Sequence, residues 1–226
     1  MGGGKSIGRL FYKYIKYAID NKYVDKILCY SSSECDYYSE LFQMPREKFA
    51  FVHLGISEIK NVQTSVGNYI FSTGRSNRDY PFLIEAEIDI PIKIACEGYV
   101  YNGSKKFNNI EILDNCRGKN MIEMMANSFC VVIPLKDINI SSGQLVFLQA
   151  MALGKPVIVT ENVTAHDYIY SGQNGYIIQK EKDELRECIN RLSNKDVYHS
   201  ISKNAKKTFI ENYTLVKLAE SVERYI

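Results

Sequence analysis

The chain has 226 residues, of which 46% are hydrophobic and 24% are charged, and its net charge at pH 7 is +2. This composition is typical of a globular chain of one or two domains with enough apolar side chains to fill a core. It excludes the strongly basic surface of a nucleic-acid-binding protein, and no apolar run is long enough to cross a bilayer.

The cysteines indicate the cellular compartment. All 6 are widely spaced, and they form no C-x-x-C pair. Because free cysteine is among the most buried residue types, reduced thiols in the core are favoured over disulfides. With no apolar signal-peptide segment in the sequence, we expect a cytoplasmic location, with at most peripheral contact at the inner face of the membrane.

The first part of the chain, residues 1–57, has too few strands for a complete domain. Its opening MGGGKSIG lacks the preceding strand and the glycine spacing of a phosphate-binding loop, so we exclude that function. Apolar residues spaced by four from Leu10 to Ile19 predict an amphipathic helix, and a packed face is favoured over a membrane-bound one. Residues 1–57 are therefore predicted to be an α/β fragment that closes a larger domain.

The remainder of the chain alternates between strand and helix patterns. Residues 58–68 are polar and predict a linker. Residues 69–212 predict a Rossmann-like, doubly wound parallel sheet of the α/β class, with helices on both faces. An apolar stripe in residues 213–226 predicts a final helix that packs on the N-terminal fragment rather than on the main sheet. Ligands of such sheets bind beyond the carboxyl ends of the strands, which makes the loops there the candidate site.

The run SSGQLVFLQAMALGKPVIVT, residues 141–160, predicts a helix followed at once by a strand. Ser141 and Gln144 have the spacing of a capping box, which predicts that Ser141 caps the helix. Gly154 and Pro156 predict its end. The residues between are apolar on every side except at Gln149, so we expect the helix to be buried all round.

Two features of this helix predict a ligand site. The free N–H groups of Ser142, Gly143 and Gln144, together with the helix dipole, favour a bound anion such as phosphate. Gln149 lies about 9 Å further along the helix and, as a buried amide, needs a fixed partner. That partner is either a hydroxyl group of a ligand or a neighbouring loop, and the residues alone favour neither.

The loop after the first strand of the main sheet offers cations. Gly74 allows a close turn, and Arg75 and Arg78 present guanidinium groups that suit oxygen anions. An exposed charge pair between Arg78 and the aspartate that follows it is an equal alternative.

Two further loops carry polar candidates. Asn115 and Arg117 lie where the edge of a nucleobase could be read, although asparagine is also a common turn residue. Asn139 precedes the capped helix and is a candidate for contacts with sugar hydroxyl groups. The ordinary polarity of loops explains these residues equally well.

The run from residue 143, with TENVTAHDYIYSGQNGYII after it and YIFSTGRSNRDYPFLIEA before it, resembles the donor-binding half of GT-B glycosyltransferases, most closely family 4. In that family two glutamates separated by seven residues bind the donor sugar and the ribose, and the corresponding positions here hold Ser141 and Gln149. The arginine that binds the donor pyrophosphate corresponds to Arg75. Tyr80 stands where the family has a lysine, and Arg78 is the candidate replacement.

The resemblance implies a GT-B donor domain at residues 69–212, joined to the tail of an N-terminal acceptor domain. It implies transfer of a sugar from a UDP- or GDP-linked donor to a glycan or lipid-linked acceptor in polysaccharide biosynthesis, with retained anomeric configuration and without a metal or other cofactor. Because most of the acceptor domain has no counterpart here, an expected partner is a chain that supplies it. The resemblance also places Asp167 at the family's acidic residue ahead of a G-x-N-G turn.

Two alternatives come from other functional classes. A non-catalytic nucleotide-sugar-binding or interaction subunit of a split glycosyltransferase is favoured by the replacement of both glutamates. A nicotinamide-binding oxidoreductase would need a G-x-G-x-x-G motif after the first strand of the main sheet, and the sequence lacks it.

Overall fold

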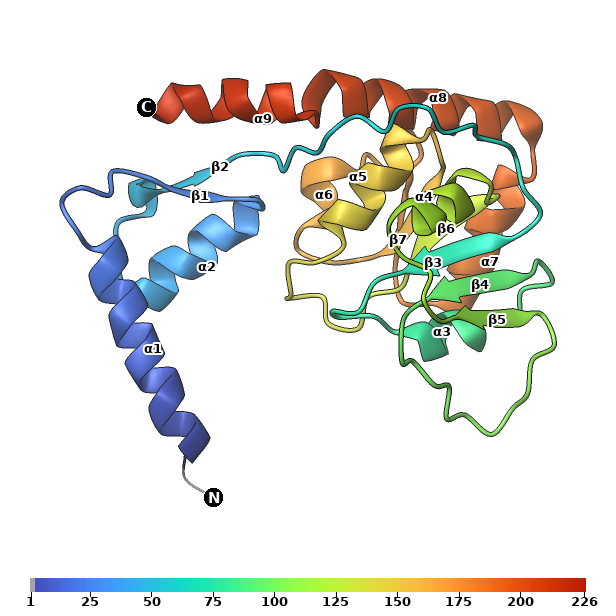
Figure 1. Ribbon diagram of the computed structural model, residues 1–226, viewed down its shortest axis with the longest axis horizontal. Coiled ribbons are helices and arrows are strands. Elements are labelled where there is room, and N and C mark those ends of the chain that lie inside the picture. The colour runs from blue at the N-terminus through green and yellow to red at the C-terminus, as the bar shows by residue number, and fades with distance from the viewer. Residues whose placement is uncertain (1–2) are drawn as a thin grey trace.

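Two parallel sheets of unequal size organise the chain (Figure 1). The computed structural model describes the backbone of residues 3–226 and the side chains of residues 11–226. A two-stranded sheet belongs to the N-terminal lobe, defined here as residues 3–57, and a six-stranded sheet belongs to the C-terminal lobe, residues 69–212. Every strand pair of the two sheets is parallel throughout the described chain.

The N-terminal lobe has a small core of its own. Its elements are α1 (Gly3–Ile19), β1 (Ile27–Cys29), α2 (Ser32–Phe42), the 3-10 helix η1 (Arg46–Lys48) and β2 (Phe49–Phe51). Cys35 and Phe49 are buried in this core, and Ile15 and Ile19 of α1 pack against it, as expected of an amphipathic helix. Met1 and Gly2 of the glycine-rich opening lie outside the described residues, and Gly3 already begins α1.

The six-stranded sheet has the strand order β5-β4-β3-β6-β7-β8. Its strands are β3 (Ile70–Thr73), β4 (Ile92–Ala95), β5 (Ile110–Leu113), β6 (Cys130–Ile133), β7 (Val157–Thr160) and β8 (Tyr176–Ile178). This order reverses between β3 and β6, and in doubly wound sheets ligands bind at that point, beyond the carboxyl ends of the strands. The predicted fold class is confirmed.

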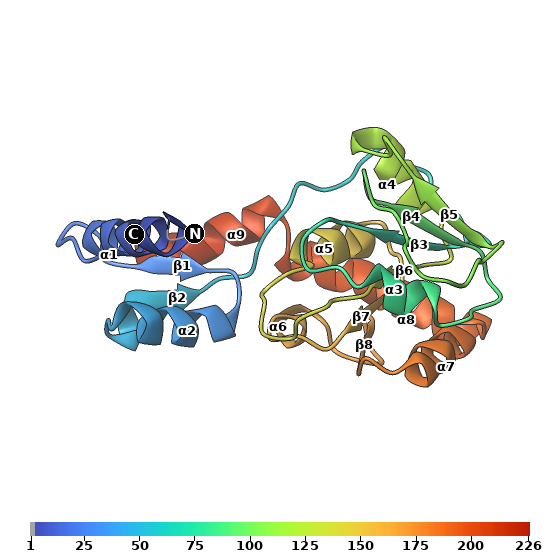
Figure 2. The same ribbon diagram turned by 90° about the horizontal axis from the view of Figure 1, so that it is seen from below.

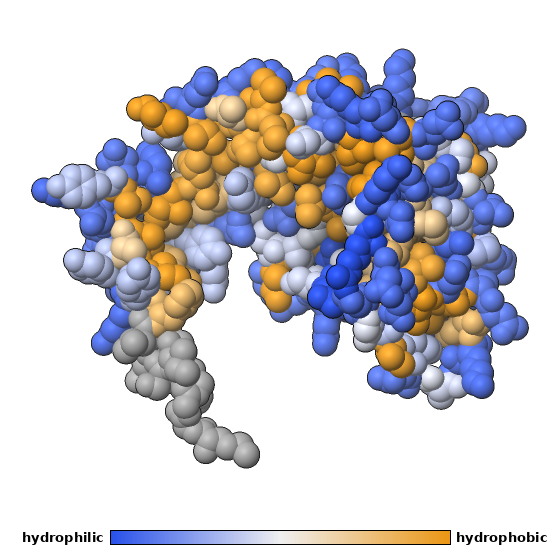
Figure 3. Space-filling model, viewed as in Figure 1, coloured by the Kyte–Doolittle hydropathy of each residue, from blue (hydrophilic) through white to orange (hydrophobic). Residues whose placement is uncertain are grey.

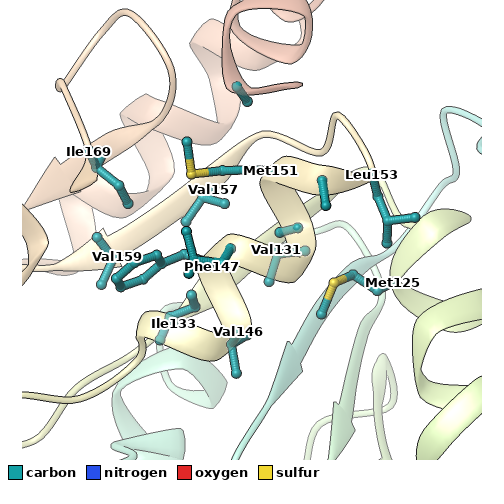
Figure 4. Close-up of a cluster of buried hydrophobic side chains, with 14 of the residues drawn as sticks. Met125, Val131, Ile133, Val146, Phe147, Met151, Leu153, Val157, Val159 and Ile169 are labelled. Atoms are coloured by element: carbon teal, nitrogen blue, oxygen red, sulfur yellow. The ribbon is translucent and has the colours of Figure 1, made fainter. Parts of the chain in front are cut away.

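Helices cover both faces of this sheet. They are α3 (Tyr80–Ile84), α4 (Gly118–Ala126), α5 (Gln144–Ala152), α6 (Ala165–Tyr168), α7 (Lys182–Leu192) and α8 (Lys195–Asn212). Successive strand residues point to opposite faces. Ile133 of β6 therefore packs with α4, α5 and α6, whereas Val132 packs with α3 and α7. Figure 4 shows Phe147 and Met151 of α5 among the side chains of β6 and β7.

Helix α5 begins later than the sequence predicted. Its N-cap is Gly143, which has φ = +96°, and no side chain caps it. The predicted capping box is wrong because the chain turns at this left-handed glycine, so that Ser141 falls short of the helix and only accepts a hydrogen bond from Gln144 Nε2 at 2.6 Å. The predicted end is confirmed, with Gly154 at φ = +65°. Leu145, 53% exposed, departs from the expected all-round burial.

Two stretches of chain connect the lobes: residues 58–68 and the turn from α8 into α9 (Leu215–Val222), which ends in the 3-10 helix η2 (Glu223–Tyr225). In both views α9 extends away from the main sheet towards the N-terminal lobe (Figures 1 and 2). A β-carbon on Gly55 would come within 2.7 Å of Leu218 Cβ, so α9 touches the end of that lobe. Val216 is 64% exposed, and hydrophobic residues are visible over α9 (Figure 3). None of the described helices is sufficiently long and apolar for a membrane span.

Candidate functional site

The loops after β3 and β6 lie side by side where the strand order reverses. Asn77, in the first loop, donates from Nδ2 to Ser142 Oγ and to the Asp137 carbonyl, at 2.9 Å each. Its Oδ1 accepts the backbone N–H of Asp137 at 2.9 Å. One asparagine thus fixes the turn that carries Arg75 beside the loop that leads into α5. Sequence reasoning missed Asn77, because nothing local marks a residue whose partners lie 60 and 65 positions away.

Arg75 lies in the wall of a cavity of about 340 Å³ at the carboxyl ends of β3, β4 and β5. Its Nη2 is 3.0 Å from Oε2 of Glu97, and Arg117 pairs with the same carboxylate. Two guanidinium groups therefore share one carboxylate, and positive charge remains in excess beside the cavity. Glu97 was not predicted; its position directly after β4, at the ligand-binding edge, is the signal that could have identified it.

The structure separates some of the predicted site residues. Gly74, Arg75 and Arg117 line this cavity, whereas the amides at the start of α5 do not. Asn115 also lies outside its lining and has φ = +59°, which indicates a turn residue. Arg75 and the start of α5, the two predicted phosphate-binding elements, therefore do not line this cavity together, and they belong to adjacent loops that Asn77 joins.

Arg78 supports the turn after β3. It donates from Nε to the Thr73 carbonyl at 3.0 Å and from Nη1 to the Ser76 carbonyl at 2.8 Å. Its guanidinium group lies so close to Gly74 that a β-carbon there would come within 2.5 Å of it. Burial lowers the pKa of Arg78 from its ordinary value. The alternative pair with Asp79 is wrong, because that carboxylate binds Lys180 and caps α3.

The amino end of α5 offers free donors. Among the described residues, no acceptor lies within hydrogen-bond reach of the backbone N–H groups of Ser142, Gly143 and Gln144. Asn162 Nδ2 holds the adjacent carbonyls of Ile140 and Ser142, at 3.0 and 3.4 Å. The predicted anion-binding geometry is thus present at the left-handed Gly143, although Ser141 does not create it.

Gln149 is half-buried, and its Oε1 is fully buried without a hydrogen-bond partner in the described part of the chain. An unpaired buried acceptor costs about 1–3 kcal/mol. The neighbouring loop that one interpretation required does not supply the partner. Gln149 lines none of the described cavities, so its role as a ligand-binding amide stays a prediction.

A second cavity, of about 400 Å³, lies between α2 and the loop that precedes α5. Asn139 and Ser141 line it from the C-terminal lobe, and Glu34 and Tyr37 line it from the N-terminal lobe. The structure thus places two predicted donor-site residues at the boundary between the lobes. The carboxylate and the tyrosine that face them were not predicted as site residues.

Asp167 joins the two lobes. Its carboxylate accepts hydrogen bonds from Ser31 Oγ at 2.9 Å, from the Ser32 backbone N–H at 2.9 Å and from Ser32 Oγ at 2.6 Å. These groups form the amino end of α2, where a negative charge also complements the helix dipole. Tyr168, the next residue, donates from its hydroxyl to the Tyr30 carbonyl at 2.6 Å.

Comparison with known proteins identifies the C-terminal lobe. Residues 105–208 match the family model described as glycosyl transferases group 1. This match lies entirely within the C-terminal lobe. The uncharacterized glycosyltransferase MJ1178 of Methanocaldococcus jannaschii is 24% identical over 96% of this chain and 62% of its own length.

Solved structures share the fold of both lobes. A glycosyltransferase from Rickettsia africae has a TM-score of 0.73 at 16% identity, over 94% of this chain and 66% of its own. Alr3699/HepE of Anabaena in complex with UDP has a TM-score of 0.76 at 15% identity, over 95% and 67%. The fold is therefore GT-B, and the chain spans about two-thirds of the length of these relatives.

The described residues contain no cluster of three or more His, Cys, Asp or Glu side chains that could hold a metal ion. The expectation that this chain works without a metal stays a prediction.

Proposed function

We propose that the chain binds a nucleotide-linked sugar, UDP- or GDP-linked, and takes part in its transfer to a glycan or lipid-linked acceptor with retention of configuration. One observation carries the proposal: the free N–H groups at Gly143 and the unpaired Gln149 Oε1 lie on one helix, at the point where the strand order reverses. In support, Alr3699/HepE, which has the same fold, has been solved with UDP and with UDP-glucose.

The chemistry we propose is mainly electrostatic. The diphosphate lies at the amino end of α5, where the helix dipole and the free N–H groups stabilise the negative charge that develops on the leaving group. Arg75 exchanges its partner Glu97 for a phosphate oxygen, and Arg117 stays with Glu97. Gln149 accepts a hydrogen bond from a ribose hydroxyl group. Arg78 fixes the backbone of the turn, and no metal is required.

A second candidate function is that of a non-catalytic nucleotide-sugar-binding subunit. The replacement of both family glutamates, by Ser141 and Gln149, favours it. In both cases the remainder of the acceptor domain, on this polypeptide or on a partner chain, is part of the proposal. Sugar transfer by the purified chain alone would exclude the second candidate.

Calorimetric titration with UDP, GDP and ADP tests nucleotide binding. We expect one of them to bind, and Arg75→Ala to weaken it about 10- to 100-fold, because a hydrogen bond to a charged group contributes about 1.5–3 kcal/mol. The matched control is Arg191→Ala, which removes an exposed guanidinium group paired with Glu187 on α7. If both variants bind the nucleotide with equal affinity, Arg75 is not part of the binding site.

A further inference from the structure

A further cavity lies at the opposite edge of the main sheet. It has a volume of about 660 Å³ and is bounded by the linker at residues 64–66, by the end of α5 at residues 153–155 and by α8. Residue 155 shortly precedes β7, and residue 66 shortly precedes β3. The cavity therefore lies at the amino ends of the strands, away from the proposed donor site.

Most of the charged side chains around this cavity are cationic. Lys203, Lys206 and Lys207 line it from α8, and Lys155 lines it from the segment between α5 and β7. Glu211 is the one carboxylate in its lining, and it pairs with Lys207 at 3.8 Å. No ion pair joins Lys203 or Lys206 to any residue that the structure describes. An anion in the cavity would meet this excess positive charge without displacing an existing partner.

Lys155 is a second, independent indication of an anion. It is only 2% exposed, and its Nζ donates to the carbonyls of Ser65 and Ser128. An ammonium group has three donors, so one remains without an acceptor in the described chain. Burial lowers the pKa of Lys155 to about 8, which reflects the cost of a buried charge that lacks a negative partner.

Apolar side chains form another part of the lining. Leu153 forms part of the floor, and the exposed side chains of Val66 and Ile210, at 59% and 51% exposure, stand at the rim. Apolar surface of this kind binds hydrocarbon and gains nothing from a bare inorganic ion. The cavity volume is within the range of small-molecule sites, about 300–1,000 Å³.

We propose that this cavity is a second binding site, for a phosphate monoester that carries an apolar chain. The phosphate lies between Lys155, Lys203 and Lys206, and the chain lies along Leu153, Val66 and Ile210. The site touches both connections between the lobes, because the linker forms one wall and α8 continues into α9 (Figure 1). This inference does not depend on the proposed donor site.

Dodecyl phosphate, used below its micelle concentration, is the test ligand. We expect saturable 1:1 binding in calorimetry, at least about tenfold tighter than that of inorganic phosphate or of the uncharged dodecyl maltoside. Bound ligand should also slow the acetylation of Lys203 and Lys206, measured by mass spectrometry. An excess of UDP should leave the binding unchanged.

The variants Lys206→Glu and Lys195→Glu form a matched pair, because both positions are exposed on α8 and both changes alter the net charge equally. Lys195 does not line the cavity. We expect Lys206→Glu to weaken binding about tenfold or more and Lys195→Glu to change it less than about twofold.

Three results would each overturn the proposal: equal effects of the two changes, displacement of dodecyl phosphate by UDP, or inorganic phosphate binding as tightly as dodecyl phosphate. If vesicles of an anionic phospholipid compete with dodecyl phosphate, the natural ligand is a membrane lipid. If they do not compete, the natural ligand is a soluble phosphate ester.

Discussion

The two edges of the six-stranded sheet both carry clustered cations, but they balance these charges differently. At the carboxyl edge, Arg75 and Arg117 share the carboxylate of Glu97. At the amino edge, Lys203 and Lys206 form no ion pair in the described chain, and Lys155 is buried against two carbonyl groups. An anion must displace an ion pair at the first edge but not at the second. The number of cations alone therefore does not measure how strongly an edge attracts anions.

Replacement of Lys155 by methionine is expected to have the largest effect. Methionine keeps the apolar stem but leaves the carbonyls of Ser65 and Ser128 unpaired, and each unpaired carbonyl costs about 1–3 kcal/mol. We expect the free energy of unfolding in urea at pH 7 to fall by about 2–4 kcal/mol. The control Lys203→Met, on the exposed face of α8, should change it by less than about 0.5 kcal/mol.

The pH dependence of stability provides a further check on Lys155. Its pKa falls from 10.5 to about 8 because the ammonium group is buried. Between these two values the unfolded chain holds the proton and the folded chain has released it, so stability rises with pH. Wild type should therefore gain stability relative to Lys155→Met across this window. Parallel pH profiles of the two proteins would show that no buried ammonium group titrates there.

Removal of the Glu97 charge should make the carboxyl edge resemble the amino edge. Glu97→Gln releases both arginines from their ion pair, so we expect the nucleoside diphosphate to bind about 3- to 10-fold more tightly in calorimetry. Glu111→Gln is the control, because this exposed carboxylate pairs with Lys93 away from the cavity. Weaker binding to Glu97→Gln would mean that the carboxylate itself contacts the ligand.

The smallest expected effect concerns the start of α5. Because Ser141 does not cap this helix, Ser141→Ala should change the free energy of unfolding by less than about 0.5 kcal/mol. Asn194 is a true cap, whose side chain accepts the N–H groups of Asp196 and Val197 at the start of α8. Asn194→Ala should cost about 1 kcal/mol in the same urea titration. If both variants lose the same free energy of unfolding, Ser141 does cap α5.

The parts of the fold that the sequence predicted are those with local signals. Gly154 and Pro156 mark the end of α5, because one takes a positive φ and the other cannot continue a helix. The alternation of apolar strands and helices is also a local signal, and it predicted the doubly wound sheet. The start of α5 was predicted wrongly because Ser141 and Gln144 have the spacing of a capping box, while the turn is made by Gly143.

The candidate site was predicted less completely, because its contacts come from separate loops. Gln149 was recognised as a buried amide in need of a partner, which is a property of a single residue. Asn77 and Glu97 were missed, since their importance lies in partners from other strands and loops. Arg78 was assigned the wrong alternative partner, because Lys180 reaches Asp79 from a distant part of the chain.

The sequence by itself determined which segments become buried strands and helices, because backbone preference and apolar spacing act over a few residues. Only the tertiary structure decided which charges meet. In the folded chain Glu97 forms ion pairs with two arginines, and the buried Lys155 donates hydrogen bonds to two carbonyl groups. These contacts form because strand order brings together residues that are far apart in the chain. How strongly a charged side chain interacts with other charges depends on these neighbours and on its burial. Neither can be read from the sequence around the charged residue alone.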